Sequence, residues 1–338
     1  MNTNFDVIFS HPGGRGWGSI EVLAELASRE LNGRLIKFDA SGGDSILKLA
    51  RGFRPRLRGG KRKLLVIAPS PAHLSAVLEL GPWLSRYCYV AGWVIDSFWT
   101  DRIPRVARTG HYFDHVYVTD PDDVAIWQSR IQGMVSCLPM GTDALEANRV
   151  STSKTVDVQR VGRQPAEWED DDAVGTDATK RGLIFVGRPA FGSDDTQSQV
   201  LQSEAMAAAR YVLAFSNRVN PTNYTHPTRE YVTARWVDSL AAGAVVAGIA
   251  PNSAAAKLLL WPGACLELGT TDRVAGLEII AKARDSWSPR DAAFNRQEAL
   301  RRLDWRHRLK TIANDLTLDS RTLDISLAQI ESQLNSMA

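Results

Sequence analysis

The sequence predicts an α/β protein with two domains, each built on a parallel sheet. In the first half, short runs rich in valine, isoleucine and aromatic residues alternate with segments of helical periodicity. The same alternation restarts after residue 180, and 338 residues suffice for two domains of ~150 residues each. Because apolar strands that alternate with helices are typical of parallel sheets covered on both faces, we expect two such sheets.

Six strands are expected in the N-terminal half, and Gly, Pro or Asp bounds most of them. Between the first two, residues 19–31 are expected to form a helix, because Ile20, Leu23 and Ala27 recur on one helical face. We therefore place a first α/β domain at residues 1–150. The expected strands span residues 6–9, 34–38, 64–68, 87–95, 115–118 and 135–138.

Residues 151–180 show no convincing periodicity and carry the acidic run 167–172, so we expect a linker there. A second domain is placed at 181–315, and the C-terminal helix at about 316–338 is expected to pack back on the first domain. Ser288-Pro289-Arg290-Asp291 is a strong helix-start signal, with a hydroxyl cap and a proline in the first turn. The expected strands span 182–186, 211–215, 244–249 and 265–268, and the expected helices 232–242, 273–283 and 289–303.

The charge balance argues against a dedicated nucleic-acid-binding protein. Lys and Arg total 40 against 38 Asp and Glu, a net charge of +2, whereas a nucleic-acid-binding domain is usually strongly basic. The longest apolar runs, at 64–69 and 241–250, are shorter than the ~20 residues that a membrane-spanning helix needs. Residues 1–6 carry neither a basic flank nor an apolar secretion segment, so we expect a cytoplasmic protein.

Several motifs of nucleotide and metal chemistry are absent from the sequence. The Gly-rich segment 11–18 does not read G-x-G-x-x-G, and no P-loop occurs, which disfavours a dinucleotide dehydrogenase and a P-loop ATPase. The three cysteines are far apart and form no metal or redox pair, and Asp120-Pro121-Asp122-Asp123 is expected to cap a helix rather than bind a metal. The glycines of segment 11–18 form either a tight turn or an acceptor or phosphate loop, because they let the backbone approach a ligand: Gly13, Gly14 and Gly16.

The most informative stretch, residues 211–252, predicts a strand, a polar loop and a helix that begins near Thr233. Arg229 and Arg235 flank that helix N-terminus, where free N–H groups and the helix dipole attract an anion such as a diphosphate. Asp238, one turn further in, can accept hydrogen bonds from a ribose diol. The alternative is an Arg235–Asp238 ion pair on a solvated face, which would contribute only about 0.2–0.5 kcal/mol.

The pattern Thr233-x-Arg235-x-x-Asp238-x-Leu-Ala-x-Gly-x-Val-Val resembles the signature of GT-B glycosyltransferases, in particular the group-1-like family that includes spore-maturation-type enzymes. The resemblance spans most of the chain, strongly at 211–250 and weakly at 1–130. It implies a GT-B fold, in which two Rossmann-like parallel-sheet domains face each other across a cleft. Three further segments resemble the same family in the same order: Leu138-Pro139-Met140-Gly141-Thr142-Asp143, Phe185-Val186-Gly187-Arg188 and Trp305-Arg306-His307-Arg308.

The resemblance implies a glycosyltransferase that moves a sugar from a nucleotide-sugar donor to a glycan, a lipid-linked molecule or another hydroxyl acceptor. It implies neither a metal nor another cofactor, because a helix dipole and Arg or Lys stabilise the leaving diphosphate in such enzymes. A GT-B-shaped epimerase or phosphorylase and a non-catalytic carbohydrate- or nucleotide-binding protein are the alternatives. Asp238 falls on the position that binds the ribose, and the other implied donor-binding residues are Gly187, Arg188, Asn217, Arg229, Thr233 and Arg235.

The N-terminal half offers three candidate catalytic residues for the acceptor side. Asp96 and Asp101 follow an expected strand, beside tryptophans whose faces suit sugar rings, and His11 lies at the end of the first strand. Capping is the alternative role for the two aspartates, and a structural loop position is the alternative for His11. Residues 51–63 contain seven cations and no acid, a run that forms either a solvated loop or a peripheral contact with the anionic inner face of a membrane.

Overall fold

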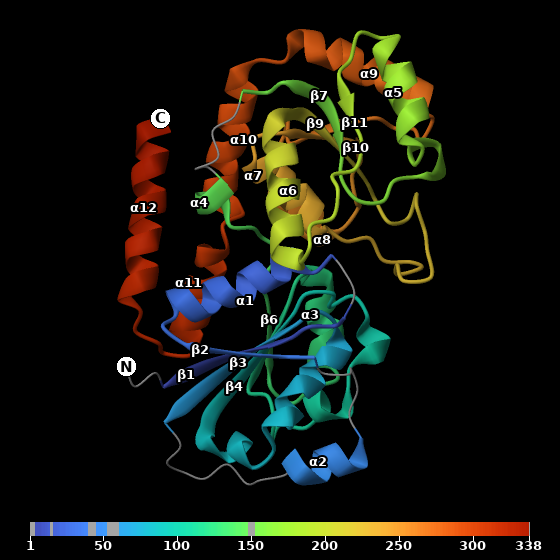
Figure 1. The fold of residues 1–338 in the computed structure, drawn as a ribbon. Helices are drawn as coiled ribbons and strands as arrows, with labels where there is room; N and C mark the ends of the chain where they lie inside the picture. The colour runs from blue at the N-terminus through green and yellow to red at the C-terminus, as the bar shows by residue number, and fades with distance from the viewer. Residues whose placement is uncertain (1–3, 14–15, 40–44, 53–60, 148–152, 338) are drawn as a thin grey trace. The chain divides into compact units, whose positions relative to one another are not determined.

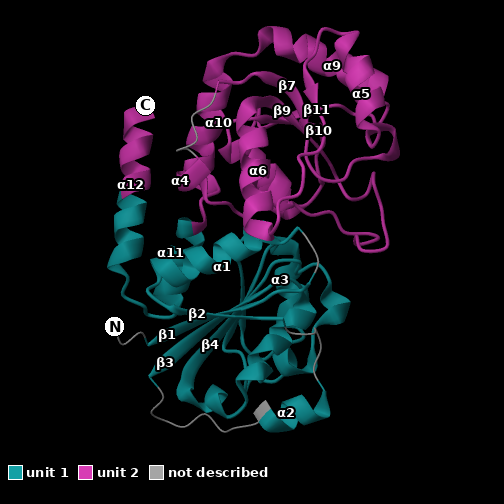
Figure 2. Ribbon diagram, viewed as in Figure 1, with its two compact units in different colours: residues 1–139, 306–328 teal, residues 140–305, 329–338 magenta. Residues whose placement is uncertain are grey.

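The computed structural model describes residues 4–13, 16–39, 45–52, 61–147 and 153–337, which form two compact units (Figure 1). Unit 1 consists of Met1–Pro139 and Arg306–Ala328, and unit 2 of Met140–Trp305 and Gln329–Ala338 (Figure 2). The chain therefore leaves unit 1, builds most of unit 2 and returns to unit 1. Each unit has its own sheet and its own apolar core.

Unit 1 is built on a parallel sheet of six strands in the order β2-β1-β3-β4-β5-β6. In register, Val7 of β1 lies opposite Leu35 of β2 and Leu65 of β3. All six residues of β1 are buried, as a strand inside a sheet covered on both faces requires. The strands are β1 (Phe5–Ser10), β2 (Arg34–Phe38), β3 (Arg62–Ala68), β4 (Tyr87–Val94), β5 (His115–Val118) and β6 (Met134–Cys137).

Helical segments connect these strands and cover the sheet. The 3-10 helix η1 (Pro71–Arg86) follows β3, and its Leu74 and Val77 belong to the main core of the unit together with Trp127 of α3. Asp120 caps α3 by accepting a hydrogen bond from the Asp122 N–H at 2.9 Å, which confirms the expected capping role. The other connections are α1 (Gly18–Glu30), α2 (Ile46–Gly52), η2 (Thr100–Arg102), η3 (Arg105–Arg108) and α3 (Pro121–Gln128).

The returning C-terminal segment is tied to unit 1 by polar contacts. Glu30, at the end of α1, is buried, and its carboxylate lies 3.3 Å from Arg306 Nε. Ser320 donates to the Glu30 carbonyl oxygen, and the Tyr117 hydroxyl donates to Asp315 at 2.8 Å. This segment contains α11 (Trp305–Asp315) and the part of α12 (Arg321–Met337) that ends at Ala328.

Unit 2 is built on a parallel sheet of five strands in the order β11-β10-β9-β7-β8. Side chains of β9 alternate between its two faces: Tyr211 and Leu213 join a core with Trp168, and Val212 joins a second core with Met206. The strands are β7 (Val156–Arg160), β8 (Phe185–Val186), β9 (Ala209–Phe215), β10 (Val245–Ile249) and β11 (Cys265–Glu267). The helical segments are α4 (Ala144–Ala147), η4 (Ala166–Trp168), α5 (Asp171–Thr179), α6 (Asp195–Ala208), α7 (Ala234–Ala241), α8 (Ala254–Leu259), α9 (Arg273–Ser286) and α10 (Pro289–Arg302).

The segment 151–180, which we expected to be a linker, instead contributes β7 and α5 to unit 2. β7 pairs with both β8 and β9. Its sequence is not an apolar run, because two of its buried side chains, Asp157 and Gln159, are polar and are hydrogen-bonded inside the unit. The acidic run is no solvated loop either, since Asp170 caps α5 by accepting from two backbone N–H groups. At the other end of the unit, the expected start of α10 is confirmed, because the Ser288 N–H donates to Asp291 at 2.7 Å.

None of the helices in the described part of the chain combines the length and the apolar composition that a membrane span requires. The same part of the chain contains no group of three or more His, Cys, Asp or Glu side chains that could hold a metal ion.

Candidate functional site

Three arginines of unit 2 gather where β7 and β8 end. Arg163 follows β7, Arg188 follows β8, and Arg235 lies in the first turn of α7. Because β7 and β8 are neighbouring parallel strands, their carboxyl ends meet at one edge of the sheet. Ligands of open parallel sheets bind beyond this edge, so its charge decides what can bind there.

Backbone carbonyls of the turn after β7 hold two of these guanidinium groups. Arg188 Nη2 donates to the Gly162 carbonyl oxygen at 3.0 Å, and Arg235 Nη1 donates to the Arg163 carbonyl oxygen at 2.8 Å. Gly162 has a φ of +68°, which a side chain would disfavour. The turn therefore positions both cations without neutralising either of them.

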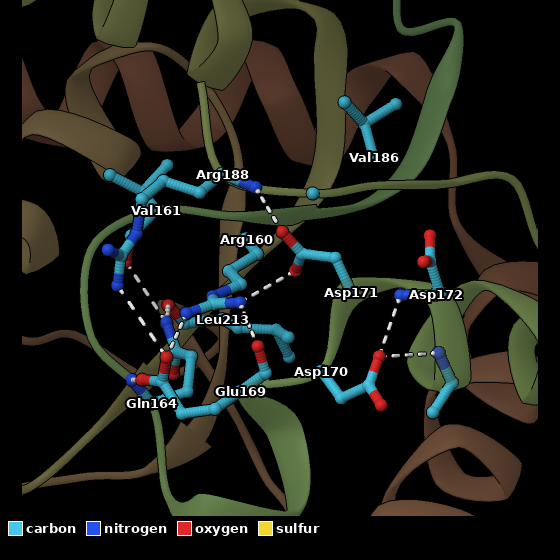
Figure 3. Close-up of polar contacts among 12 residues, drawn as sticks. Arg160, Val161, Gln164, Glu169, Asp170, Asp171, Asp172, Val186, Arg188 and Leu213 are labelled. Carbon is cyan, nitrogen blue, oxygen red and sulfur yellow. Dashed lines mark hydrogen bonds and ion pairs between the residues drawn. The ribbon is translucent and has the colours of Figure 1, made fainter. Parts of the chain in front are cut away.

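The nearby carboxylates of Glu169 and Asp171 pair mainly with a fourth arginine. Arg160, the last residue of β7 and only 3% exposed, lies between Glu169 and Asp171 (Figure 3). Its Nη1 lies 2.8 Å from Asp171 Oδ1, and its Nη2 pairs with Glu169. Asp171 also accepts from the Arg188 backbone N–H at 3.1 Å, which fixes the loop after β8. Glu169 is 3.7 Å from Arg188, so Arg188 shares an acid that Arg160 already binds.

The cluster of Arg163, Arg188 and Arg235 therefore carries excess positive charge. Burial, together with Arg163 and Arg188, lowers the pKa of Arg235 to about 10. The buried Nη1 of Arg163 has no hydrogen-bond partner within the described part of the chain. Like charges that are packed together and incompletely paired favour the binding of an anion.

The N-terminus of α7 adjoins this cluster through Arg235. Thr233 is the N-cap residue, and its buried hydroxyl has no hydrogen-bond partner among the described residues. Asp238 lies one turn further along α7 and is partly buried. The helix thus places a cation and a carboxylate on successive turns, with the positive end of its dipole nearest the cation.

A polar loop after β9 supplies a further set of groups. Asn217 Nδ2 donates to the carbonyl oxygens of His226 at 3.2 Å and Arg229 at 2.9 Å, which closes the loop. The buried Oδ1 of Asn217 has no partner within the described residues. Ser216 donates to Glu230, a carboxylate that our sequence analysis did not single out.

The glycines predicted to let the backbone approach a ligand differ in the reason why glycine is required, which is either a close neighbour or a positive φ. A Cβ added at Gly187 would lie 2.5 Å from Asp171 Oδ2, so a side chain there would displace the carboxylate that holds Arg160 and the Arg188 N–H. Gly13 and Gly16 have φ values of +77° and +103° with open space around the added Cβ. Gly14 lies outside the described residues.

The three catalytic candidates lie in unit 1 and have different surroundings. Asp96 follows β4, and burial raises the pKa of its carboxyl to about 7. Asp101, in η2, is exposed. His11 follows β1, and its Nδ1 accepts from the Gly13 N–H at 3.1 Å and lies 4.0 Å from Asp39. The raised pKa of Asp96 suits a general base that acts near neutral pH.

Arg160, Arg163, Glu169 and Asp171 belong to this site, yet the sequence analysis missed them because they lie in the expected linker. A signal was present: Val161-Gly162-Arg163, directly after β7, repeats Val186-Gly187-Arg188, whose valine ends β8. The same tripeptide at the ends of two strands indicates two similar loops at one sheet edge.

The architecture is similar to that of two solved structures. Sucrose-phosphate synthase from Thermosynechococcus elongatus matches with a TM-score of 0.52 and 11% identity, over 99% of this chain and 100% of that chain. A glycosyltransferase involved in avilamycin A biosynthesis matches with a TM-score of 0.51 and 14% identity, over 95% and 98%. No protein-family model and no curated protein sequence matches the chain. The likeness shows the fold: the protein has the GT-B fold that the sequence predicted.

Proposed function

We propose that the protein is a glycosyltransferase that uses a nucleotide-sugar donor and a hydroxyl acceptor. The observation that carries the proposal is the incompletely paired cluster of Arg163, Arg188 and Arg235 in a unit of a GT-B fold. Fold alone does not define an activity, but a cationic cluster at the carboxyl edge of the sheet defines the charge of the ligand. An anion as compact and as highly charged as a diphosphate matches three arginines.

In this proposal the arginines act on the leaving group. Breaking the bond between sugar and diphosphate leaves negative charge on the diphosphate, and preorganised cations stabilise that charge. The N-terminus of α7, entered through Thr233, adds the helix dipole. Because these groups supply the stabilisation themselves, we propose that transfer needs no bound metal.

The rest of the donor is assigned to neighbouring groups. Asp238, a turn beyond Arg235 on α7, accepts hydrogen bonds from the ribose hydroxyls. Asn217 offers its buried Oδ1 to a hydroxyl of the transferred sugar, since this atom has no partner within the described residues. Gly187 allows the donor to approach the backbone of the loop after β8.

Unit 1 is assigned to the acceptor, a glycan or a lipid-linked molecule. Asp96 removes the proton from the attacking hydroxyl, because burial raises its pKa to about 7 and makes it a stronger base than an exposed aspartate. His11 and Asp101 are the other candidates. The expected sugar-stacking role of the aromatic residues beside Asp96 has no support, because Phe98 and Trp99 are buried and the Arg102 guanidinium lies 3.4 Å from the centre of the Trp99 ring.

A thermal-shift titration with UDP, GDP, dTDP and CMP, each with and without EDTA, tests the donor site. At a concentration of about 100 times Kd, a nucleotide stabilises the protein by about 2.7 kcal/mol. We expect one diphosphate to stabilise the wild type with and without EDTA, and Arg188→Gln to abolish the shift. The matched control is Arg290→Gln, an exposed arginine of α10 in the same unit. The absence of a shift with every nucleotide would contradict the proposal.

Turnover separates transfer from the other reactions of similar folds. We expect nucleotide release only with a hydroxyl acceptor, in a 1:1 ratio to the glycosylated product, at about the rate of its formation. Turnover that depends on inorganic phosphate would indicate a phosphorylase instead, and release of nucleotide without a glycosylated product an epimerase. Binding without turnover across a broad acceptor panel would indicate a non-catalytic protein.

A further inference from the structure

Two neighbouring elements of unit 1 expose large apolar side chains. On α2, Ile46 is 77% exposed and Leu47 is 71% exposed, and on η1 Trp83 is 55% exposed. The two elements pack against each other and are joined by an ion pair of 2.5 Å between Lys48 and Glu79. We call Ile46, Leu47 and Trp83 the α2–η1 patch; α2 lies at the lower end of the view in Figure 1.

The packing of α2 explains why this patch faces away from the core. Leu49 of α2 packs against the main core of unit 1 with Leu80 of η1, and the Leu49 carbonyl oxygen accepts from the Tyr112 hydroxyl at 3.2 Å. These contacts attach α2 without the help of Ile46 or Leu47. Ile46 and Leu47 are thus exposed to solvent although the attachment of α2 does not depend on them. Exposed apolar side chains of this kind are typical of an interaction surface.

Exposed cations lie on both elements of the patch, and a third precedes Arg62, which pairs in register with Tyr87 at the end of η1. The guanidinium of Arg86 lies 3.6 Å from the centre of the Trp83 ring, and Arg51 and Lys61 are exposed. Glu79, the acid on η1 that faces α2, is already paired with Lys48. The patch therefore combines apolar side chains with net positive charge.

The described part of the cationic run 51–63 has two kinds of members. Arg62 pairs with the buried Asp6 at 2.5 Å, and Lys63 donates to the carbonyl oxygen of Thr317 at 2.9 Å, so both serve the fold. Arg51 and Lys61 are exposed. The arginines at 54, 56 and 58 lie outside the described residues, and the patch does not include them.

We propose that the α2–η1 patch docks the protein on an anionic phospholipid surface. Ile46 and Leu47 enter the boundary between headgroups and acyl chains, where Trp83 also lies with its ring at headgroup depth. Arg51, Lys61 and Arg86 contact lipid phosphates, which gives the surface its preference for anionic lipid. An apolar protein partner would not require this excess of cations. The inference goes beyond the proposed transferase activity and does not depend on it.

Co-sedimentation with vesicles tests the proposal on the full chain. Vesicles of phosphatidylcholine with about one quarter phosphatidylglycerol are compared with pure phosphatidylcholine, at low salt and at about 0.5 M NaCl, where charges are screened within a few Å. We expect the wild type to bind the anionic vesicles at low salt at least tenfold more tightly than the neutral ones. High salt is expected to weaken this binding.

Two sets of variants separate the apolar and charged contributions. The combined change Ile46→Ser, Leu47→Ser and Trp83→Ser is expected to weaken binding at least tenfold. The combined change of the three cations to Gln (Arg51, Lys61 and Arg86) is expected to weaken it by about fivefold per charge.

Matched controls carry the same changes on exposed residues of unit 2. Leu258→Ser with Val274→Ser, and Lys282→Gln with Arg290→Gln, are expected to bind vesicles as the wild type does. Circular dichroism checks that each variant is folded. The proposal is overturned if the wild type does not bind anionic vesicles, if the Ser variant of the patch binds as tightly as the wild type, or if neutral vesicles bind equally well.

Discussion

Arg235→Met is expected to make the free protein more stable while it abolishes nucleotide binding. The guanidinium of Arg235 is held in the arginine cluster at an energetic cost, because burial and the charges of Arg163 and Arg188 disfavour its charged form. Methionine keeps the apolar stem of the side chain and removes the charge. A residue that only supported the fold would show the opposite effect on stability.

The magnitude follows from the pKa and from one hydrogen bond. A fall in the pKa of Arg235 from 12.5 to about 10 corresponds to a cost of about 3 kcal/mol for the charged form. Arg235→Met also loses the hydrogen bond to the Arg163 carbonyl oxygen, which contributes about 1 kcal/mol. The net gain is about 2 kcal/mol, or a rise in Tm of roughly 4–8 °C for a unit of this size.

The assay is thermal unfolding with and without the nucleotide that stabilises the wild type. We expect a higher Tm for the free Arg235→Met variant and no further rise with nucleotide, with Arg290→Met as a control that changes neither value. A fall of several degrees in the Tm of the free variant would refute the reasoning, because Arg235 would then be holding the fold together. A preserved nucleotide shift would refute it as well.

Three further predictions concern the catalytic candidate and the two cores. Because burial raises the pKa of Asp96 to about 7, the rate of transfer should fall as the pH drops through about 7, and a flat pH profile would contradict this. Asp96→Asn should lower kcat at least about 100-fold and leave the rise in Tm with nucleotide unchanged. Burial alone would raise the pKa of Asp6, but hydrogen bonds from two arginines and a tyrosine hold this pKa below its usual range. The ionised carboxylate therefore stabilises the folded protein above pH ~4, and this stabilisation is lost as the pH falls through the lowered pKa. Asp6→Asn should therefore cost about 2–4 kcal/mol in urea unfolding at pH 7 and progressively less as the pH is lowered below 4, and a cost that does not change with pH would contradict the assignment. Gly248→Ala should destabilise the protein by more than about 3 kcal/mol, because the new Cβ would overlap the Ala214 carbonyl oxygen, whereas Gly175→Ala inside α5 should stabilise it by up to about 1 kcal/mol; urea unfolding measures both, and equal effects would contradict the geometry.

The inner strands of unit 1 could be predicted because they are nearly continuous apolar runs. Residues 64–68 and 115–118 are predicted as strands, and they lie within β3 and on β5, which are both inside the sheet. A run of this kind has one stable location, the middle of a covered parallel sheet, so local pattern and tertiary structure agree. Its interpretation needs no knowledge of distant residues.

Elements that bury polar side chains could not be predicted in this way. In β7, Asp157 is buried because Arg210, more than fifty residues away, pairs with it. α6 is rich in Ser and Gln and buries only Met206 and Ala207 among its apolar residues, so its periodicity is weak. In both cases the partner that makes the structure stable is absent from the local sequence.

The candidate site shows the same division. Arg188, Arg235 and Thr233 could be selected because a recognisable motif carries them, and the structure brings Arg188 and Arg235 to one turn. Arg163 was missed because it belongs to a strand end whose strand was missed. The raised pKa of Asp96 depends on burial by the folded unit, which sequence spacing does not reveal.

The return of the chain to unit 1 has a consequence for the order in which the protein is made. Glu30 leaves the ribosome early, whereas Arg306, which neutralises it, is 276 residues further along the chain. The N-terminal sheet must therefore wait for the synthesis of residues 140–305 of unit 2 before its last helical segment arrives. Contacts between such distant residues form slowly, because a long loop has to close first. A nascent chain released before residue 306 would carry an incomplete N-terminal unit, and this makes the interval during translation the period of greatest exposure to misassembly.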